Sequence, residues 1–399
     1  MSRLSFKELL GFYISHLRDD VMPFWLKYTI DDEYGGILNC VSDDGRNESG
    51  KKNLWSQGRG LWTFAALFND FDQDERWLDL ARHTARFIMD HGKTADGSYA
   101  FSLNRNGSVC EPPQSVYVDA FVMSGLGEFA LATGDQRAID TCVDIFERTS
   151  PMLDANHWEL PAQPHPIPQN VQSHGPLMIY ALCYHDLGLV TNDQRHFARG
   201  LELADRIMAE HVNQGDRLLY EFVKPRRNGG GKIDSDAGKT YVPGHAVESM
   251  WFMDRIFSHH HREEMIPRLF EVARWHLEKG WDDEYGGLLL ARRTDGGTPV
   301  WHKPDTKAWW AHTESLYALL RAHEAIGEPW CMDWYWRIHD YTFKMFPNKE
   351  HGDWRQNLTR DGKVAKPVAA NLQFKDPYHL PRALLYSILV LRRLTAAAG

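Results

Sequence analysis

An alternation between two kinds of helix is the feature of this sequence that most constrains its fold. Every second predicted helix is largely apolar, as in "FVMSGLGEFALA", whereas the others are amphipathic, as in "ERWLDLARHTARFIMDHG". The apolar helices start at steps of roughly 60 to 75 residues. This rhythm predicts stacked helix pairs, and six pairs can close into a ring with the apolar helices inside. Helical periodicity places about twelve helices, near residues 5–19, 56–69, 74–91, 115–134, 136–149, 174–188, 193–212, 244–258, 263–279, 305–326, 328–346 and 381–396.

The chain shows no boundary that would divide it into separate domains. Its 399 residues contain no Pro- or Ser-rich linker, no low-complexity block and no sharp shift in composition. Hydrophobic residues make up 43%, which is ample for one large core. The stretch "DDEYGG" occurs at Asp31–Gly36 and again at Asp282–Gly287, so connections on one side of the ring recur in form. We therefore expect a single all-α domain over residues 1–399, with short strand-like pieces in its connections.

Charge and cysteine usage exclude several classes of partner and location. The chain has 45 basic and 54 acidic residues, for a net charge of −9 without long basic runs. This balance argues against nucleic acid and anionic membranes as partners. The five scattered cysteines suit reduced thiols in a cytosol. The N-terminal stretch lacks a signal peptide's apolar core, and no apolar run reaches about 18 residues. We therefore expect a cytoplasmic protein without a membrane span.

Polar side chains lie near the starts of the predicted apolar helices, where a purely structural core helix would not need them. If these helices run parallel, their starts meet at one mouth of the ring, in a pocket that aromatic side chains would line. His245 and Glu248 share one helix face at i and i+3. The candidates are Arg59, His174, His245, Glu248, Glu314, His379 and Arg382, with Trp309 and Trp310 as the aromatic residues.

Each candidate also has an ordinary structural role that the sequence leaves open. Arg59 could be a surface charge, although an arginine in a first helical turn opposes the helix dipole. The histidines could cap helices or lie in the core, and Glu314 could pair with a neighbouring helix. Trp309 and Trp310 could equally be core residues. The expected convergence of all these residues favours a functional site.

The available side chains fit proton transfer next to a carbonyl better than metal or phosphate chemistry. The chain has no H-E-x-x-H or H-x-x-x-H motif, no P-loop and no G-x-S-x-G elbow, so we expect neither metal nor cofactor. His245 and His379 would lie at helix starts, where the helix dipole lowers a histidine's pKa and leaves the ring neutral near pH 7. Glu248 would fix the ring tautomer of His245, and Arg59 would stabilise an enolate oxygen.

Several further motifs follow one another in a distinctive order along nearly the whole chain. They include "EYGGILNCVSDDGR", "LWSQGRGLWTFAALFN", "VPGHAVESMWFM", "GWDDEYGG", "WWAHTESLYALL" and "DPYHLPRALL". Taken together, they resemble the N-acylglucosamine 2-epimerase family. The resemblance implies an (α/α)6 barrel and reversible epimerisation or isomerisation at C2 of a reducing sugar, without a metal. It also implies a small-molecule sugar as partner and leaves a homodimer open.

The resemblance also implies roles for individual residues. His245, in "GHAVE", and His379, in "YHLPR", match the two acid/base histidines, and Arg59 matches the arginine of "QGR". Glu248 and Glu314 match the family's helix acids. The residues that match as substrate-binding groups are Trp309, Trp310, His174 and Arg382.

Two stretches depart from the family pattern and leave the sugar open. "GKTYVPGH" has Lys239 where animal N-acetylglucosamine epimerases would have an arginine, and "NLQFKDPYH" replaces a Gly- and Trp-rich stretch. Interconversion of N-acetylglucosamine and N-acetylmannosamine is the main expectation, with mannose–fructose isomerisation or cellobiose 2-epimerisation as alternatives. A more distant alternative is an inverting glycoside hydrolase with Glu248 and Glu314 as its two acids. A non-catalytic sugar-binding module is the third reading.

Overall fold

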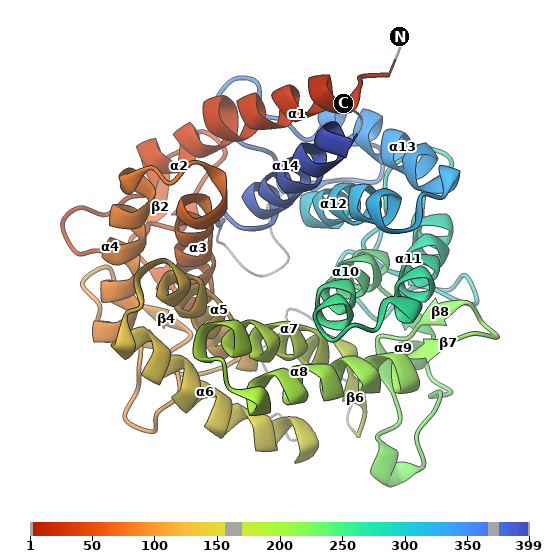
Figure 1. Cartoon of the computed structure of the whole chain (residues 1–399), viewed down its shortest axis with the longest axis horizontal. Coiled ribbons are helices and arrows are strands. Elements are labelled where there is room, and N and C mark those ends of the chain that lie inside the picture. Colours follow the sequence, from red (N-terminus) through yellow and green to blue (C-terminus); the bar gives the residue numbers. More distant parts are fainter. Residues whose placement is uncertain (1–2, 156–169, 366–374, 398–399) are drawn as a thin grey trace.

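The computed structural model describes residues 3–155, 170–365 and 375–397, which fold into a ring of helix pairs (Figure 1). This arrangement is the (α/α)6 barrel that the sequence predicts. The inner helices of the described chain are α3 (Leu54–Ala66), α5 (Val116–Thr133), α7 (His174–Thr191), α10 (Pro243–His259), α12 (Trp309–Ile326) and α14 (His379–Ala397). The outer layer contains α1 (Phe6–Ser15), α2 (Met22–Tyr28), α4 (Glu75–His91), α6 (Gln136–Ala155), α8 (Gln194–Arg206), α11 (Ile266–Gly280) and α13 (Pro329–Met345).

The inner helices pack side by side in chain order, α3 on α5, α5 on α7, α7 on α10, α10 on α12 and α12 on α14. The ring closes between its last and first inner helices. There the ring of Trp62 contacts those of Tyr378 and Tyr386, at centroid distances of 5.4 and 5.7 Å. Arg392 Nη1 also donates to the carbonyl oxygen of Asp70 at 3.1 Å. These contacts join α14 to α3 and to the turn that follows α3.

The turns from inner to outer helices are short and occupy one end of the ring. Gly134 after α5 and Gly327 after α12 take left-handed backbone conformations, with φ of 68° and 66°, which glycine adopts without steric cost. After α7, the outer helix α8 begins where Asp193 accepts a hydrogen bond from the backbone N–H of Arg195. These turns force each outer helix to run back along the ring wall.

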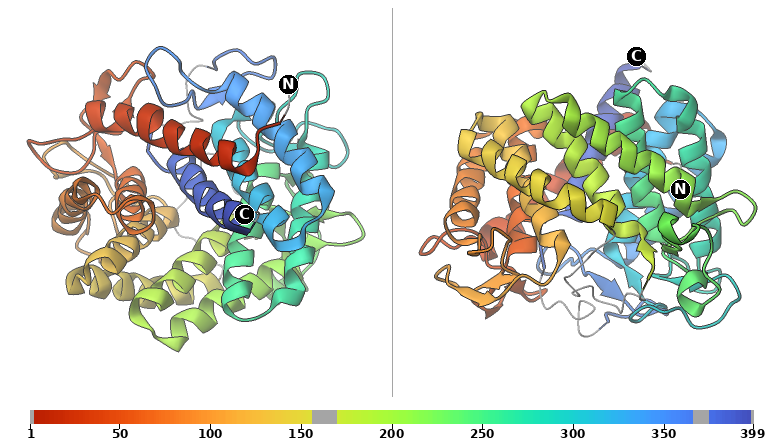
Figure 2. Two further views of the ribbon diagram at one scale, coloured as in Figure 1. Left: turned by 45° about the horizontal axis from the view of Figure 1, so that its top comes forward. Right: turned by 90° about the horizontal axis from the view of Figure 1, so that it is seen from below.

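The long connections from outer to inner helices carry the strands, which gather at the opposite end of the ring (Figure 2, right). All the described pairings are antiparallel, β1–β2, β3–β4–β5, β6–β9, β7–β8, β10–β11 and β12–β13. A four-residue helix, α9 (Asp236–Lys239), precedes β10. The strands are β1 (Cys40–Val41), β2 (Asn47–Ser49), β3 (Lys52–Asn53), β4 (Ser102–Leu103), β5 (Val109–Glu111), β6 (Gln172–Ser173), β7 (Val212–Asn213), β8 (Leu218–Leu219), β9 (Phe222–Val223), β10 (Thr240–Tyr241), β11 (Arg292–Arg293), β12 (Lys307–Ala308) and β13 (Asn357–Leu358).

The repeated "DDEYGG" stretch builds the same ionic support twice. In the first copy, Asp31 pairs with the fully buried Lys52 at 2.7 Å and accepts two hydrogen bonds from Arg105 at 2.8 and 2.9 Å. In the second copy, Asp282 pairs with Lys307 at 3.2 Å and accepts two from Arg360 at 2.9 and 3.0 Å. Each lysine also donates to the backbone oxygen of its own arginine, 53 residues further along the chain.

Two side chains on inner helices accept hydrogen bonds from the backbone just after each "DDEYGG" stretch. The backbone N–H of Ile37 donates to Gln57 Oε1 at 2.8 Å, and that of Leu288 donates to His312 Nε2 at 2.9 Å. Both acceptors lie on inner helices, α3 and α12. The supports therefore tie two long connections to the starts of two inner helices.

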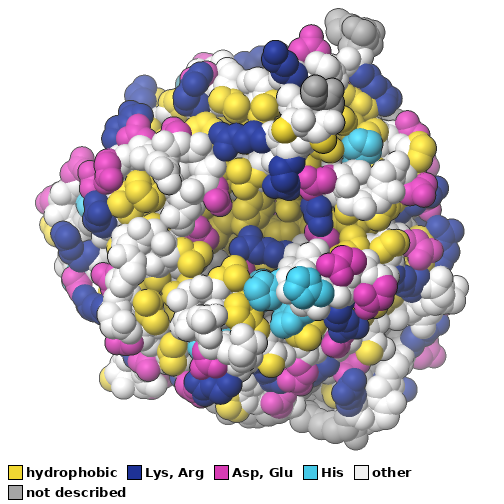
Figure 3. Space-filling view, in the orientation of Figure 1, with side chains coloured by type: hydrophobic (Ala, Val, Ile, Leu, Met, Phe, Trp, Pro, Cys, Tyr) yellow, Lys and Arg dark blue, Asp and Glu magenta, His cyan; other side chains and the backbone are white. Residues whose placement is uncertain are grey.

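The end of the ring opposite the strands is hollowed, with hydrophobic side chains on the floor and Lys or Arg side chains around it (Figure 3). Trp251, Tyr317 and Tyr386 form an aromatic layer within the ring, with centroid distances of 5.0 to 5.8 Å. Helix α5 is long and apolar enough to cross a membrane by length and composition alone, but it contains Asp119 and Glu128, and 67% of the stretch is buried inside the structure.

Several predicted helix boundaries were wrong for identifiable reasons. The first helix does not end near residue 19, because a π-helical turn, His16–Val21, leads into α2 with Pro23 in its first turn. Helix α12 starts at residue 309, not 305, because Lys307 and Ala308 form β12. Helix α14 starts at His379 rather than Pro381, and α3 starts at Leu54, so Arg59 lies in its second turn and not its first.

Candidate active site

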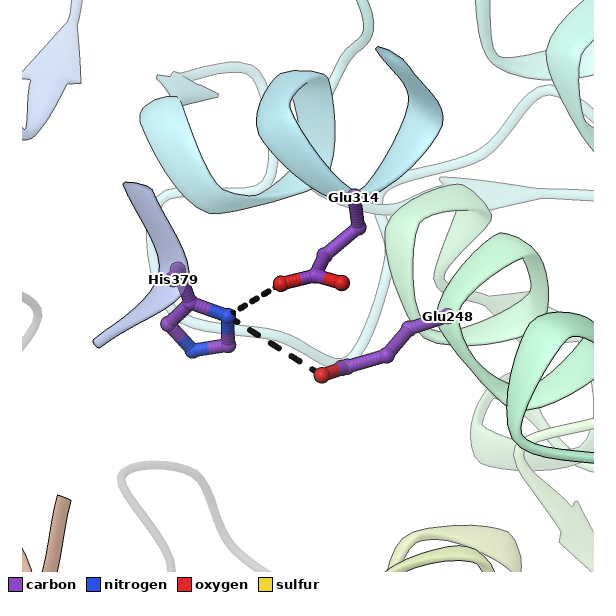
Figure 4. Close-up of side chains that lie close together, drawn as sticks. All are labelled: Glu248, Glu314 and His379. Carbon is purple, nitrogen blue, oxygen red and sulfur yellow. Dashed lines mark hydrogen bonds and ion pairs between the residues drawn. The ribbon is translucent and has the colours of Figure 1, made fainter. Parts of the chain in front are cut away.

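The strand end of the ring brings Arg59, Glu314 and His379 into contact from three inner helices. His379 Nδ1 lies 2.8 Å from Glu314 Oε1, and its Nε2 lies 3.2 Å from Arg59 Nη2 (Figure 4 shows the glutamate side). Because a guanidinium can only donate, Nε2 must accept and Nδ1 must carry the proton given to Glu314. Burial and the charge of Arg59 hold the pKa of His379 well below its usual value. His379 is therefore a neutral imidazole with a basic Nε2.

Arg59 is held by an acid and by aromatic faces. Its Nη1 lies 3.3 Å from Asp376 Oδ2, and its guanidinium lies over the rings of Phe121, Tyr378 and Trp55, at 4.1, 4.9 and 5.1 Å. Burial raises the pKa of Asp376, and the arginine opposes that shift. The groups that stabilise the charge of this arginine within an inner helix thus come from α3, α5 and the segment before α14.

Arg382 lies beneath the catalytic candidates and joins the two helix acids. Its Nη2 donates to Glu248 Oε1 and, at 2.7 Å, to Glu314 Oε1, while its Nη1 donates to Tyr378 Oη at 2.9 Å. The side chain is 2% exposed. These contacts do not fit the direct substrate binding expected for Arg382, because its guanidinium is committed to buried partners.

Glu248, Glu314 and His379 also have the composition of a metal site, with ligand atoms within 4.8 Å of one another (Figure 4). The Oε1 atoms of the two glutamates are those to which Arg382 donates. A guanidinium on these oxygens already supplies the positive charge that a divalent cation would bring. The donor set therefore fits an internal arginine better than a metal ion.

His245 lies at the third residue of α10 and contacts an acid that the sequence did not suggest. Its Nδ1 is 3.2 Å from both carboxylate oxygens of Glu221, which lies between β8 and β9. Burial disfavours the charged ring, but the charge and hydrogen bond of Glu221, followed by the charge of Glu248, raise the pKa of His245. The expectation that the helix start would lower this pKa was wrong, because a carboxylate in contact outweighs the dipole.

The orienting role expected for Glu248 toward His245 was also wrong. Glu248 lies one turn along α10 but accepts from Arg382, and its Oε1 is 3.9 Å from His379 Nδ1. His174, expected to bind substrate, is fully buried at the first residue of α7. Its Nε2 lies 3.0 Å from Ser249 Oγ and its Nδ1 lies 3.9 Å from Glu221, so it backs the acid rather than facing the pocket.

The two tryptophans meet the two histidines. The ring of Trp310 lies 5.2 Å from that of His245 and 5.9 Å from that of His379, tilted by 32° and 38°. Trp309 meets His379 edge-on at 5.9 Å. Both indoles are partly exposed. Trp310 therefore offers an apolar face next to both histidines.

Sequence reasoning missed two acids of the site, Glu221 and Asp376. Both lie in connections without helical periodicity, and each is buried beside a charged partner. The only signal was a lone acid within an apolar stretch, as in "LLYEFV". Of the two departing stretches, Lys239 forms ion pairs with Asp234 and Asp295 at 3.6 and 3.7 Å, and residues 371–374 lie outside the described part of the chain.

Known proteins share both the sequence and the architecture. An N-acylglucosamine 2-epimerase from Bos taurus is 29% identical over 379 residues, covering 92% of this chain and 87% of that protein. A cellobiose 2-epimerase from Bacteroides fragilis is 28% identical over 384 residues, covering 90% and 93%. The solved structure of cellobiose 2-epimerase from Bacillus thermoamylovorans B4167 has the same fold, with a TM-score of 0.82 at 20% identity over 96% of this chain and 99% of that one. The family model of N-acylglucosamine 2-epimerase (GlcNAc 2-epimerase) matches residues 35–383, and the chain therefore belongs to the N-acylglucosamine 2-epimerase family.

Proposed function

We propose that this chain is a sugar 2-epimerase in which His379 is the base and His245 is the acid. The observation that carries this proposal is the contrast between two histidines beside one indole, with Arg59 on Nε2 of His379 and Glu221 on Nδ1 of His245. His379 has a lowered pKa and presents a free-base Nε2, whereas His245 has a raised pKa and a carboxylate on its Nδ1. Proton abstraction and return on opposite faces of one carbon require such a pair.

The proposed reaction begins with the open-chain aldehyde of the sugar, resting on Trp310. His379 Nε2 takes the proton from C2, the electron pair of the broken C–H bond forms the C1–C2 double bond, and the carbonyl electrons move to the C1 oxygen to give an enolate. Arg59, whose Nη2 lies 3.2 Å from Nε2, stabilises the negative oxygen on C1. His245 then donates its proton to the opposite face of C2, which restores the aldehyde as the C2 epimer.

The favoured substrates are N-acetylglucosamine and N-acetylmannosamine. The family match and the N-acylglucosamine 2-epimerase relative support this choice. The cellobiose 2-epimerase relative supports a disaccharide as the alternative. If the proton taken from C2 returned to C1, the same residues would yield a ketose, as in mannose–fructose isomerisation.

The glycoside hydrolase alternative fits the geometry poorly. Two inverting acids need their carboxyl groups about 6.5–9.5 Å apart to admit a water molecule. Here the nearest carboxylate oxygens of Glu248 and Glu314 lie within 4.8 Å of each other. Both accept from Arg382, which leaves neither available as a free acid or base.

The test is incubation with N-acetylglucosamine, N-acetylmannosamine, mannose and cellobiose in D₂O, followed by proton NMR. An epimerase places deuterium at C2 and produces the epimer, an isomerase gives ketose signals, and a hydrolase splits cellobiose. A binding module leaves every sugar unlabelled, which would overturn the proposal.

Two histidine variants make this test specific. His379→Gln should abolish exchange at C2. The matched control is His312→Gln on the same inner layer, because Gln57 already performs the role of His312 at the equivalent turn. The control should keep turnover, and equal loss in both variants would refute the role of His379.

A further inference from the structure

Glu221 ties together the starts of two inner helices and faces the site between them. Its carboxylate is 3% exposed and lies 3.2 Å from His245 Nδ1 through each oxygen. Its own backbone oxygen accepts from the N–H of His174 at 2.9 Å, next to the β6–β9 pairing of Ser173 with Phe222. The short sheet therefore fixes the carboxylate at one height in the ring.

The surroundings of Glu221 keep it ionised. Burial alone would raise the pKa of this carboxyl, but the charge and hydrogen bonds of His245, with His174 3.9 Å away, hold it below its usual range. His174 is itself anchored by Ser249 of α10, and the ring of His211 lies behind it at 5.6 Å. The titratable groups that face His245 are Glu221 from the sheet, Glu248 from its own helix and His379 from α14.

We propose that Glu221 is a positioning residue of the epimerase, which holds a proton on His245 Nδ1 so that Nε2 delivers the second proton to the sugar. This inference rests on the proposed function and extends it to a residue outside the helix motifs. When His245 gives up its Nε2 proton, the Nδ1 proton remains shared with Glu221. The carboxylate keeps its charge throughout, and the proton from C2 is held by His379.

The same geometry gives His174 a supporting position. With Nε2 at 3.0 Å from Ser249 Oγ, its ring presents Nδ1 toward Glu221 at 3.9 Å. Successive contacts thus run from Ser249 to His174, from His174 to Glu221 and from Glu221 to His245. A variant that removes the charge of Glu221 but keeps the shape of its side chain therefore isolates the electrostatic effect of Glu221 on His245.

The decisive variant is Glu221→Gln, which keeps the shape and removes the charge. Titration of His245 by NMR should move to lower pH by about one to three units, the effect of losing an opposite charge in contact. The basic limb of the kcat/KM profile should move with it. Glu221→Asp withdraws the carboxylate from His245 Nδ1 and should shift both in the same direction by a smaller amount. It would carry the test alone if Glu221→Gln failed to fold.

The matched control is Asp31→Asn, which removes another buried carboxylate at the strand end of the ring that pairs with Lys52 and Arg105 instead of histidines. It should leave the His245 titration and the pH profile unchanged. In a His245→Ala background, Glu221→Gln should cause no further loss of rate.

A folded Glu221→Gln enzyme with an unmoved His245 titration would overturn this inference. An unchanged titration in Glu221→Asp would do the same where only that variant folds. Absence of C2 exchange by the unaltered enzyme would instead overturn the proposed function, while the His245 titration would still report on Glu221. The two failures are thus distinguishable.

Discussion

Replacement of Arg382 by methionine tests whether this residue is an internal counter-ion or a substrate ligand. Methionine keeps much of the apolar stem but leaves Glu248 and Glu314 buried without their shared cation. Removal of one partner from a buried ion pair costs about 3–5 kcal/mol. The guanidinium of Arg382 also lies over the rings of Trp251, Phe252 and Tyr378, at 5.0, 5.4 and 4.4 Å, and methionine removes this charge from the aromatic faces. We therefore expect Arg382→Met to lower the free energy of unfolding by about 3–5 kcal/mol at pH 8.

The pH dependence of this loss gives a second readout. Without the arginine, burial raises the pKa of Glu314 further above its usual value, so the folded state binds more protons than the unfolded state. A raised carboxyl pKa makes stability fall as pH rises, by at most about 1.4 kcal/mol per pH unit for each proton. The destabilisation should accordingly be smaller at pH 5 than at pH 8.

The assay is equilibrium denaturation by urea at pH 5 and pH 8, followed by far-ultraviolet circular dichroism. The triple variant Arg382→Met, Glu248→Gln, Glu314→Gln should regain much of the stability, because no buried charge is left unpaired. A loss below about 1 kcal/mol, combined with a large increase in KM, would refute the counter-ion reasoning and return Arg382 to the substrate.

Two further predictions follow from the supports and from the histidine pair. Asp31→Asn and Asp282→Asn should each lower the free energy of unfolding by about 2 kcal/mol at pH 7. Burial would raise the pKa of each acid, but the bound arginine and lysine outweigh it and hold the pKa at about 2. A depressed carboxyl pKa stabilises fully above the unfolded value of 3.8, and this stabilisation is lost as the pH falls through the folded value of about 2. Denaturant unfolding near pH 2 should therefore show a much smaller difference from the unaltered chain. An equal loss at both pH values would contradict the ionic account. The kcat/KM profile should be bell-shaped. Its acidic limb should lie below pH 6.5, where His379 becomes protonated, and its basic limb above pH 6.5, where His245 loses its proton. A basic limb at or below pH 6.5 would contradict the assignment.

The helix layer was predictable because its signal is local. Inner helices such as α5 and α7 are apolar on nearly every side, which only a doubly covered position explains. Arg59, Glu314 and His379 were also predictable, because a polar residue stands out in such a helix. Their meeting, at 2.8 and 3.2 Å around one imidazole, confirms the expected convergence.

The partners of these residues were not predictable, because contact across the ring leaves no periodic pattern in the chain. Glu221 precedes His245 by 24 residues, and the β6–β9 pairing next to it holds it beside the histidine. Arg382, 134 residues further along the chain, donates a hydrogen bond to Glu248. The i, i+3 spacing therefore wrongly linked Glu248 to His245. The protonation of each histidine depends on these partners, which is why a helix-dipole argument misjudged one of the two.

The doubled ionic support has a consequence for how the pocket can change. Seven residues after Lys52 lies Arg59, and seven residues after Lys307 lies Glu314, so the two supports aim opposite charges into the same mouth. Three residues after each lysine lies a tryptophan, Trp55 or Trp310. In both places the same ionic support holds the start of an inner helix, while the residue that this helix brings to the mouth differs. Chemistry at the mouth can be altered at one helix start at a time while both ionic supports are retained.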